Sequence, residues 1–428
     1  MKAAVYTLGC KVNQYESQEI ISSLKEAGYI ITDHKDSADI YIINSCTVTA
    51  ESSRKTRQAV RRFRNEYPDS IIVLTGCFPQ AFPDEAASLT EADIILGNKT
   101  NHTVTEKIAC FIKNKKRIVE TEKHERNDSY RGRAIDSFDA HTRAFIKIQD
   151  GCNRYCSYCI IPKARGFSRS RPLEAIGEEL KQLAQAGYKE VVFVGINLSS
   201  YGLDNGTDIC DALELAEKTE GIERFRLGSL EPDHITDSVI NRLASMSKFC
   251  PQFHLSLQSG SNRILRQMNR HYTAEEYLEL CKKLSATFPD ISLTTDIIVG
   301  FPGETDEDFN ETLEFARKCG FMKVHVFPFS PREGTPAYNY RDKILNSVKN
   351  HRCTVLQKSC DEIREAFLKE YIGKTVEVLF ETPKNGMQQG YTKNYTPVAI
   401  FCDKDISGQI LPVEITELYE DGVSGILK

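Results

Sequence analysis

The stretch Gly151-Cys152-Asn153-Arg154-Tyr155-Cys156-Ser157-Tyr158-Cys159 carries three cysteines in the spacing C-x3-C-x2-C. Three thiolates at this spacing can bind one face of a metal centre. A structural zinc site needs four ligands, and no fourth cysteine or histidine follows nearby. A four-iron cluster held by three cysteines leaves one iron open for a further ligand. A zinc loop with a distant fourth ligand, or three unrelated thiols, are the alternatives.

Three further cysteines share one setting, because each follows a short apolar run. Cys10 follows residues 5–9, Cys46 follows residues 40–45, and Cys77 follows residues 71–76. Such runs are typical of buried parallel strands, and the helical stretches between them, 17–27 and 51–64, complete a βαβ pattern.

The carboxyl ends of parallel strands gather along one edge of a sheet, where ligands bind. We therefore expect Cys10, Cys46 and Cys77 to converge there. Cysteine is also a frequent core residue, and this alternative explains one such position better than it explains three. Two triads would hold two iron-sulfur clusters with open positions.

At this point the chain resembles the S-adenosylmethionine (AdoMet)-dependent methylthiotransferases, over essentially its whole length. The sequence after Cys10 most resembles that of the branch that modifies threonylcarbamoyladenosine in tRNA. The matching segments are Thr7-Leu8-Gly9-Cys10-Lys11-Val12-Asn13-Gln14-Tyr15-Glu16-Ser17, Asn44-Ser45-Cys46-Thr47-Val48-Thr49, Thr75-Gly76-Cys77-Phe78-Pro79-Gln80, Ile161-Pro162-Lys163-Ala164-Arg165-Gly166 and Ser168-Arg169-Ser170-Arg171-Pro172-Leu173-Glu174.

This resemblance implies two [4Fe-4S] clusters and AdoMet, used both as radical source and as methyl donor. The cluster on Cys152, Cys156 and Cys159 would cleave AdoMet reductively, with Tyr158 packed beside it. The cluster on Cys10, Cys46 and Cys77 would hold the sulfur to be inserted. All six cysteines are therefore candidate catalytic and metal-binding residues.

The implied reaction converts threonylcarbamoyladenosine at position 37, next to the tRNA anticodon, to its 2-methylthio derivative. Alternative substrates are isopentenyladenosine in tRNA and an aspartate of a ribosomal protein. An alternative of another class is an iron-sulfur protein that binds RNA or transfers electrons without methylthiolation.

The order of the predicted elements divides the chain into four parts. An α/β domain with a parallel sheet is expected over 1–115, a linker over 116–140, a radical AdoMet core over 141–370 and a small β-barrel resembling a TRAM domain over 371–428. Six strands alternate with helices in the third part, which predicts a partial (β/α)6 barrel. They lie near 144–148, 191–195, 225–228, 253–257, 293–299 and 324–329.

Residues just past the strand ends of such a barrel are candidate AdoMet contacts. Gly195, Ser229, Gln258 and Gly300 occupy these positions. Glycine permits close backbone approach to a ligand, although any one of the four could equally be a turn residue.

Composition favours an intracellular enzyme. The 14 cysteines are about 3% of the 428 residues, well below a disulfide scaffold. No apolar run of about 18 residues predicts a membrane span, and no signal-peptide pattern begins the chain. We expect a cytoplasmic monomer that uses an external one-electron reductant and no membrane.

The expected partner is a tRNA anticodon stem-loop, although the net charge of −5 is unfavourable overall. Basic residues lie on both sides of the cysteines in the sequence. They would make salt-sensitive phosphate contacts, or they would simply form a solvent-exposed helix face. The acidic C-terminal part would have to use one face, with Tyr391, Lys393 and Tyr395 as candidates. The basic clusters are Arg54, Arg57, Arg61 and Arg64; Lys113, Lys115, Lys116 and Arg117; and Lys163, Arg165, Arg169 and Arg171.

Overall fold

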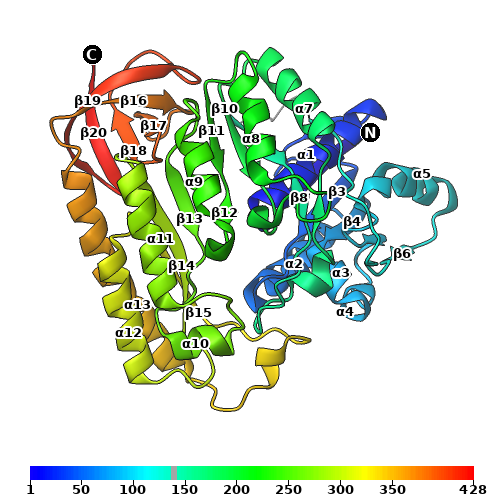
Figure 1. The fold of residues 1–428 in the computed structure, drawn as a ribbon. Coiled ribbons are helices and arrows are strands. Elements are labelled where there is room, and N and C mark those ends of the chain that lie inside the picture. Colours follow the sequence, from blue (N-terminus) through cyan, green and yellow to red (C-terminus); the bar gives the residue numbers. More distant parts are fainter. Residues whose placement is uncertain (136–141) are drawn as a thin grey trace. The chain divides into compact units, whose positions relative to one another are not determined.

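A computed structural model describes residues 1–135 and 142–428, which form two compact units (Figure 1). Unit 1 comprises Met1–Ile135, Lys147–Arg171 and Ser330–Asn339. Unit 2 comprises the described part of Asp136–Ile146 together with Pro172–Phe329 and Tyr340–Lys428. The α/β class, the parallel N-terminal sheet, the barrel-like core and the C-terminal β-barrel are all as predicted.

Unit 1 is built on a six-stranded parallel sheet in the order β2-β1-β3-β4-β5-β6. Its strands are β1 (Lys2–Thr7), β2 (Ile30–Thr32), β3 (Ile40–Ser45), β4 (Ile71–Gly76), β5 (Ile94–Leu96) and β6 (Ile118–Glu120). The helices between them are α1 (Lys11–Glu26), α2 (Ala50–Glu66), α3 (Cys77–Ala81), α4 (Pro83–Ala87) and α5 (Val104–Asn114).

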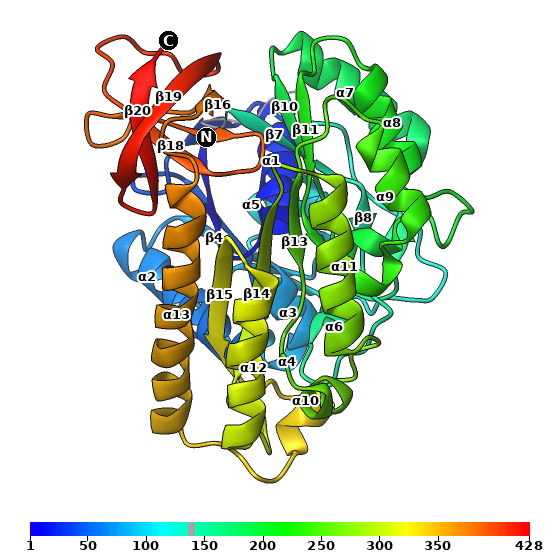
Figure 2. The ribbon, with the colours of Figure 1, turned by 60° about the vertical axis from the view of Figure 1, so that its left-hand side comes forward.

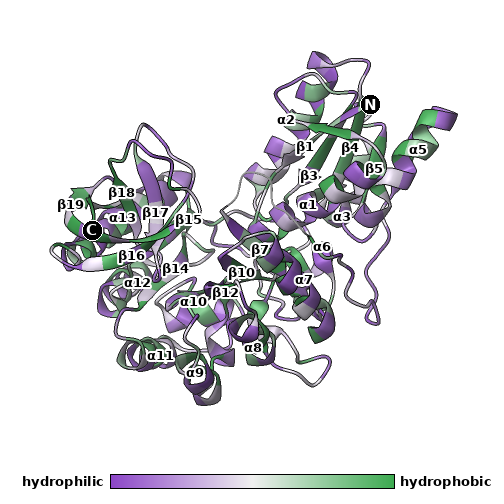
Figure 3. Ribbon diagram, turned by 90° about the horizontal axis from the view of Figure 1, so that it is seen from above, coloured by the Kyte–Doolittle hydropathy of each residue, from purple (hydrophilic) through white to green (hydrophobic). Residues whose placement is uncertain are grey.

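Both faces of this sheet are apolar and covered, which is why its strands read as continuous hydrophobic runs. Ile43 and Leu74 lie on one face, against Phe63 of α2 and the α3–α4 segment. Ile42 and Val73 lie on the other face, with apolar residues of α1 and α5. Figure 3 colours β1, β3, β4 and β5 mainly as hydrophobic.

The linker predicted over 116–140 begins inside this sheet, because β6 pairs in parallel with β5. Beyond β6 the chain also bonds to unit 1: the Tyr15 hydroxyl donates to the carbonyl of Arg133 at 2.8 Å, and Tyr130 donates to the carbonyl of Lys147 at 2.7 Å. Residues 136–141, which include the end of the predicted linker, lie outside the described residues. The domain boundaries stay predictions.

The remaining segments of unit 1 form a small substructure around the second cysteine motif. β8 (Gln149–Asp150) pairs antiparallel with β9 (Arg169–Ser170), and the short helix α6 (Ile161–Arg165) lies between them in sequence. The pairing closes a loop that contains Cys152, Cys156 and Cys159.

Unit 2 contains the predicted core strands, divided between two sheets in the orders β11-β10-β7 and β12-β13-β14-β15. The six predicted strands are all present, and their predicted ends differ from the observed ends by no more than two residues. The short strand β12 is not among the predicted strands. The strands are β7 (Arg143–Lys147), β10 (Glu190–Val194), β11 (Arg224–Leu227), β12 (Ser229–Leu230), β13 (Gln252–Leu255), β14 (Ser292–Val299) and β15 (Lys323–Pro328).

Helices cover one side of these strands, and Figure 2 shows α11, α12 and α13 running beside β13 to β15. Phe253 of β13 packs there against Phe249 and Phe288. The helices of unit 2 are α7 (Leu173–Gln185), α8 (Ile209–Lys218), α9 (Asp237–Ala244), α10 (Asn262–Gln267), α11 (Ala274–Thr287), α12 (Asp306–Cys319) and α13 (Asn346–Lys369).

The C-terminal part is a closed five-stranded barrel in the order β16-β17-β18-β20-β19. Val378, Phe380, Val398, Val413 and Val423 fill its core. Its strands are β16 (Thr375–Phe380), β17 (Gln388–Thr392), β18 (Pro397–Ile400), β19 (Ile410–Tyr419) and β20 (Gly422–Leu427). Within the described residues, none of the helices is both long and apolar enough to cross a membrane.

Candidate active site

Cys10, Cys46 and Cys77 follow β1, β3 and β4, which are neighbours in the parallel sheet of unit 1. The structure therefore brings the first triad together at the carboxyl edge of this sheet. Gly9 and Gly76 precede two of the cysteines with φ of +114° and +99°, values that favour glycine. A Cβ on Gly9 would lie 2.7 Å from the Cβ of Cys46, so the Cys10 and Cys46 loops could not approach with a larger residue there.

Asn13 holds the three cysteine loops in register. Its side-chain amide donates to the carbonyl of Leu8 at 2.8 Å and to that of Ser45 at 2.9 Å, just before Cys10 and Cys46. Its Oδ1 lies 3.8 Å from Sγ of Cys10 and 3.9 Å from Sγ of Cys77. One buried side chain thus contacts all three loops.

A buried charge network lies directly behind Asn13. Arg165 donates to Oδ1 of Asn13 at 2.8 Å and to both carboxylate oxygens of Glu16 at 2.6 and 2.8 Å. Lys147 bonds to Glu16 at 2.7 Å and to Asp150 at 2.8 Å. Although burial raises it, the charges of Arg165 and Lys147 hold the pKa of Glu16 below its ordinary value.

The network also affects the first triad. Burial raises the pKa of the Cys77 thiol to about 12, and the Arg165 cation opposes that rise. A metal ligand must be the thiolate, so a nearby cation favours the form that binds iron.

A second cation reaches the first triad from residues 330–339. Arg332 is buried and donates to Oγ1 of Thr47 at 2.7 Å and to Oγ of Ser53 at 2.9 Å. Thr47 follows Cys46, so Arg332 fixes the residue next to a candidate ligand. Its guanidinium also lies 4.9 Å from the ring centroid of Phe82.

The second triad lies in the loop between β8 and β9 of unit 1. Gly151 and Tyr155 have φ of +72° and +50°, and a Cβ on Gly151 would lie 1.9 Å from the carbonyl oxygen of Phe167. The amide of Cys152 donates to the carbonyl of Gly166, and that of Cys159 to the carbonyl of Cys156, each at 3.0 Å. The loop is thus closed by backbone contacts. Tyr158 lies within it and is partly buried.

The two triads share a wall within unit 1. Cys77 and Ala81 of α3 pack against Ile160 and Ala164, which follow Cys159. The side-chain amide of Asn98 donates to the carbonyl of Ala164 at 2.6 Å and lies 4.0 Å from Sγ of Cys77. A rigid contact therefore joins the helix that begins at Cys77 to the helix that follows the second triad.

Among the described residues, the sulfurs of the two triads are spread more widely than the ligands of a single ion. Sulfurs bound to one tetrahedral zinc lie about 3.8 Å apart. Within the described part of the chain, neither triad has all three sulfurs within 4.8 Å of one another. Wider spacing is what a four-iron cluster requires, because each cysteine binds a different iron.

The four candidate AdoMet contacts lie in unit 2. Gly195 follows β10, whereas Ser229 is the first residue of β12. Gln258 has φ of +71° and exchanges backbone hydrogen bonds with β14, donating to Asp296 and accepting from Ile298. A Cβ on Gly300 would lie 2.3 Å from Cγ of Lys349, so packing against α13 already accounts for this glycine.

Most of the predicted phosphate-binding arginines have partners within the protein. Arg54, Arg57, Arg61 and Arg64 pair with Glu51, Glu85, Glu91 and Asp93. Arg165, Arg169 and Arg171 are buried, with 1%, 8% and 2% of their surfaces exposed. Arg117 donates to the carbonyls of Ala87, Leu89 and Ala92. The exposed cations that remain in these clusters include Lys113, Lys115 and Lys116.

The aromatic pair of the C-terminal barrel also packs within unit 2. The rings of Tyr391 and Tyr395 stack at 4.4 Å, and the Arg143 guanidinium lies 4.9 and 4.8 Å from their centroids. Arg226 contacts Tyr395 and donates to the carbonyl of Lys393 at 3.1 Å. These contacts give the pair a packing role and weaken its candidacy for stacking on RNA bases.

The buried network is the part of the site that sequence reasoning misses. The sequence places Arg165 in a phosphate-binding cluster and predicts no role for Asn13, Glu16, Lys147 or Asp150. A signal is present, because Cys10, Asn13 and Glu16 recur at three-residue spacing and so share one side of the helix that starts there.

Family models match three parts of the chain. The radical SAM superfamily covers residues 146–316, uncharacterized protein family UPF0004 covers 2–97, and the TRAM domain covers 369–427. With the barrel-like core and the C-x3-C-x2-C loop, these matches define a radical AdoMet enzyme that carries an additional cysteine-bearing α/β domain.

Relatives with known names identify the family within the radical AdoMet enzymes. The chain is 38% identical to "Threonylcarbamoyladenosine tRNA methylthiotransferase MtaB" of Bacillus subtilis and of Thermotoga maritima, in both cases over 98% of this chain and 95% of the relative. It is 36% identical to "tRNA-2-methylthio-N(6)-dimethylallyladenosine synthase" of Caldicellulosiruptor saccharolyticus, over 96% of this chain and 89% of the relative. The chain belongs to the radical AdoMet methylthiotransferase family, whose cofactors are an iron-sulfur cluster and AdoMet.

Solved structures support the fold. The radical S-adenosylmethionine methyltransferase TsrM from Kitasatospora setae aligns with a TM-score of 0.58 at 15% identity, covering 79% of this chain and 77% of its own. The cobalamin-dependent radical enzyme OxsB aligns with a TM-score of 0.54 at 14% identity, over 85% of this chain and 56% of its own.

Proposed function

We propose that this protein methylthiolates tRNA, at carbon 2 of N6-threonylcarbamoyladenosine at position 37 next to the anticodon. The observation that carries the proposal is the first cysteine triad, built by three strand ends around Asn13. A radical enzyme that only cleaved AdoMet would need the second triad alone. The additional site supports insertion of a sulfur group.

The threonylcarbamoyl substrate is favoured over isopentenyladenosine by two observations. The relatives that carry the MtaB name are 37–38% identical, and those named for dimethylallyladenosine are 35–36% identical. The sequence Lys11-Val12-Asn13-Gln14 after Cys10 also resembles the threonylcarbamoyl branch.

In this proposal each triad holds one [4Fe-4S] cluster. Bound to the protein, the clusters and AdoMet supply the radical and sulfur chemistry that an unactivated aromatic C–H bond requires. Cys152, Cys156 and Cys159 hold the cluster that binds AdoMet, and Cys10, Cys46 and Cys77 hold the other.

The surrounding residues orient and balance these ligands. Asn13 keeps the Cys10, Cys46 and Cys77 loops at a fixed spacing through its contacts to Leu8 and Ser45. Arg165 places positive charge beside Cys77, whose thiol pKa burial raises, and Arg332 holds Thr47 next to Cys46. We propose that the protein acts as a monomer in the cytoplasm with an external one-electron reductant.

Nucleoside mass spectrometry of tRNA tests the proposal. Deleting the gene should remove the 2-methylthio form of threonylcarbamoyladenosine, leave that of isopentenyladenosine intact, and be reversed by the wild-type gene. Loss of the isopentenyl product instead would assign the protein to the sister branch. No change in either nucleoside, together with AdoMet cleavage by the purified protein, would favour a protein substrate. Absence of cleavage would favour a non-catalytic iron-sulfur protein.

A further inference from the structure

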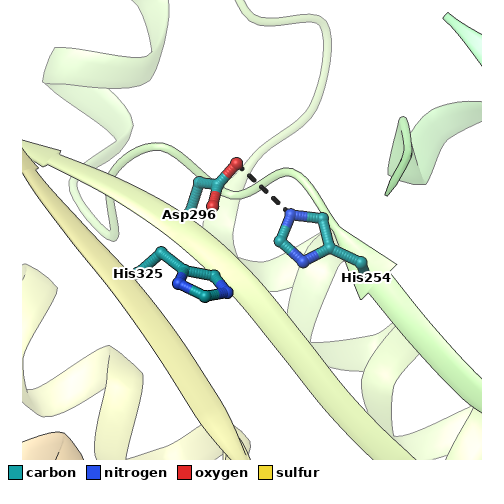
Figure 4. A group of neighbouring side chains, drawn as sticks. All are labelled: His254, Asp296 and His325. Atoms are coloured by element: carbon teal, nitrogen blue, oxygen red, sulfur yellow. Dashed lines mark ion pairs between the residues drawn. The ribbon is translucent and has the colours of Figure 1, made fainter. Parts of the chain in front are cut away.

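Three metal-ligating side chains meet in unit 2, away from both cysteine triads in sequence. His254, Asp296 and His325 lie on the adjacent strands β13, β14 and β15, and their ligand atoms all lie within 4.8 Å of one another. Figure 4 shows the three side chains on the same side of the sheet, with the Asp296 carboxylate directed at the His254 ring.

The strand register explains why the three residues meet. Asp296 pairs directly with His325, and His254 pairs with Thr294, two residues before Asp296. Side chains two residues apart share a face, so all three project from one face of the sheet. Their neighbours Phe253 and Thr295 are buried on the opposite face. Rigid strands, rather than loops, therefore set the spacing of the group.

The observed distance suits a shared metal ion. Nε2 of His254 lies 3.3 Å from Oδ2 of Asp296. Two ligands about 2.1 Å from one tetrahedral ion are separated by about 3.4 Å, whereas an N–H to oxygen hydrogen bond is commonly about 2.9 Å. The pair is spaced as two ligands of one ion would be.

A supporting contact orients the His254 ring. Its Nδ1 lies 3.0 Å from Oγ1 of Thr294, which also accepts a hydrogen bond from the Gln252 amide at 3.2 Å. Assigning the ring proton to Nδ1 directs the lone pair of Nε2 towards Asp296. Metal-binding histidines are commonly held through their other nitrogen in this way.

Burial and the charged groups around the site act on the pKa of His325 in opposing directions. Burial lowers the pKa of His325, Asp296 opposes the change, and His254, Lys323 and Arg364 add to the lowering. An ion pair between His254 and Asp296 alone would not account for His325, whose ligand atom also lies within 4.8 Å of theirs.

We propose that His254, Asp296 and His325 bind one divalent first-row transition metal ion through two imidazole nitrogens and one carboxylate oxygen. Two histidines and one carboxylate suit Fe²⁺, Co²⁺ or Zn²⁺ better than the all-oxygen ions Ca²⁺ and Mg²⁺. Three protein ligands leave at least one coordination position for water or another oxygen donor. The site is independent of the proposed tRNA substrate.

The test uses the full-length protein with its iron-sulfur clusters reconstituted, so that the six motif cysteines are occupied. Equilibrium dialysis against Co²⁺, with cobalt and iron counted separately by mass spectrometry, should give about one tight Co²⁺ per chain. His325→Ala and Asp296→Asn should each weaken Co²⁺ binding at least about tenfold. His351→Ala, which changes an exposed histidine on α13, is the matched control and should bind as the wild type does.

X-ray absorption at the cobalt edge should find nitrogen and oxygen ligands without sulfur. Unchanged iron content and thermal melting would establish that each variant is folded. The proposal is overturned if the wild type binds no Co²⁺, if the ligands include sulfur, or if folded His325→Ala and Asp296→Asn bind Co²⁺ as tightly as His351→Ala.

Discussion

The two cysteine triads of unit 1 are built in opposite ways. Cys152, Cys156 and Cys159 lie within eight consecutive residues of one loop, and the pairing of β8 with β9 closes that loop. Cys10, Cys46 and Cys77 are separated by 36 and 31 positions and meet only because β1, β3 and β4 are neighbours. A contiguous loop keeps its ligands close in sequence, whereas the first triad exists only in the folded sheet.

This difference predicts different sensitivities. The first triad depends on Asn13 and on a buried network that draws in Lys147, Asp150 and Arg165 from the segment that carries the second triad. The helix α6 contacts the helix that begins at Cys77. A substitution in the network should therefore cause more iron loss at the first triad than at the second.

The largest expected effect comes from removing the contiguous triad. Changing Cys152, Cys156 and Cys159 together to Ala should reduce bound iron from about eight to about four per chain and reduce AdoMet cleavage to background. Iron analysis and 5′-deoxyadenosine formation under strong reductant measure the two effects. A matched triple variant at Cys110, Cys353 and Cys402 should keep both. Full iron retention in the first variant would refute the cluster assignment.

Removing the dispersed triad should separate the two steps. Changing Cys10, Cys46 and Cys77 to Ala should also leave about four irons, but AdoMet cleavage should stay measurable while methylthio product disappears. Product is measured by mass spectrometry of tRNA treated with the purified enzyme. Product at the wild-type rate would mean that the strand-end cysteines are not a catalytic site.

A substitution in the buried network tests whether the two cysteine triads differ in sensitivity. Arg165→Met leaves Lys147 as the cation that Glu16 and Asp150 share, and the loss of Arg165 should cost about 3 kcal/mol of stability and lower the melting temperature of the cluster-loaded protein. Iron loss should occur mainly at the first triad, so AdoMet cleavage should outlast product formation.

Arg54→Met is the matched control for that change. Arg54 also pairs with a carboxylate, Glu51, but both side chains are about half exposed, so solvent screens the pair and the melting temperature should hardly move. Equal effects of the two substitutions would mean that the buried network contributes no more than a surface ion pair.

The smallest expected effect concerns RNA binding. Changing Lys113, Lys115 and Lys116 to Gln should weaken tRNA binding and reduce its salt dependence by up to about 0.9 in the logarithmic slope for each phosphate that is no longer neutralised. Fluorescence anisotropy across a salt series measures this slope. Changing Arg54, Arg57 and Arg61 to Gln should have less effect, because Glu51, Glu85 and Glu91 already pair with them. A larger effect of the arginine variant would instead support the predicted phosphate-binding surface on α2.

Comparison of prediction and structure shows where sequence reasoning is reliable. The strand predicted near 144–148 is β7, and the strand predicted near 293–299 is β14. Apolar runs bounded by glycine and polar residues report burial directly, so such elements can be found. β6 lies within the segment predicted as a linker over 116–140, because its three residues are too few to carry a recognisable pattern.

The basic clusters show where sequence reasoning fails. Arg57, Arg61 and Arg64 have the helical spacing of an exposed phosphate-binding face, yet their partners lie about 30 positions away, at Glu85, Glu91 and Asp93. Arg165 carries the same formal charge as a surface arginine, and only its burial against Glu16 and Asp150 gives it a structural role. Charge can be counted in a sequence, but pairing depends on which segments pack together.

The sequence by itself determined the spacing of the six motif cysteines and the parallel sheet, because ligand spacing and strand burial are properties of short segments. The family followed from the resemblance of the motif segments. Only the tertiary structure decided that Asn13 joins three cysteine loops and that Arg165 is an internal cation. It also decided that His254, Asp296 and His325 meet across three strands. Each of these depends on strand order and register, which place residues tens of positions apart within hydrogen-bond or coordination distance.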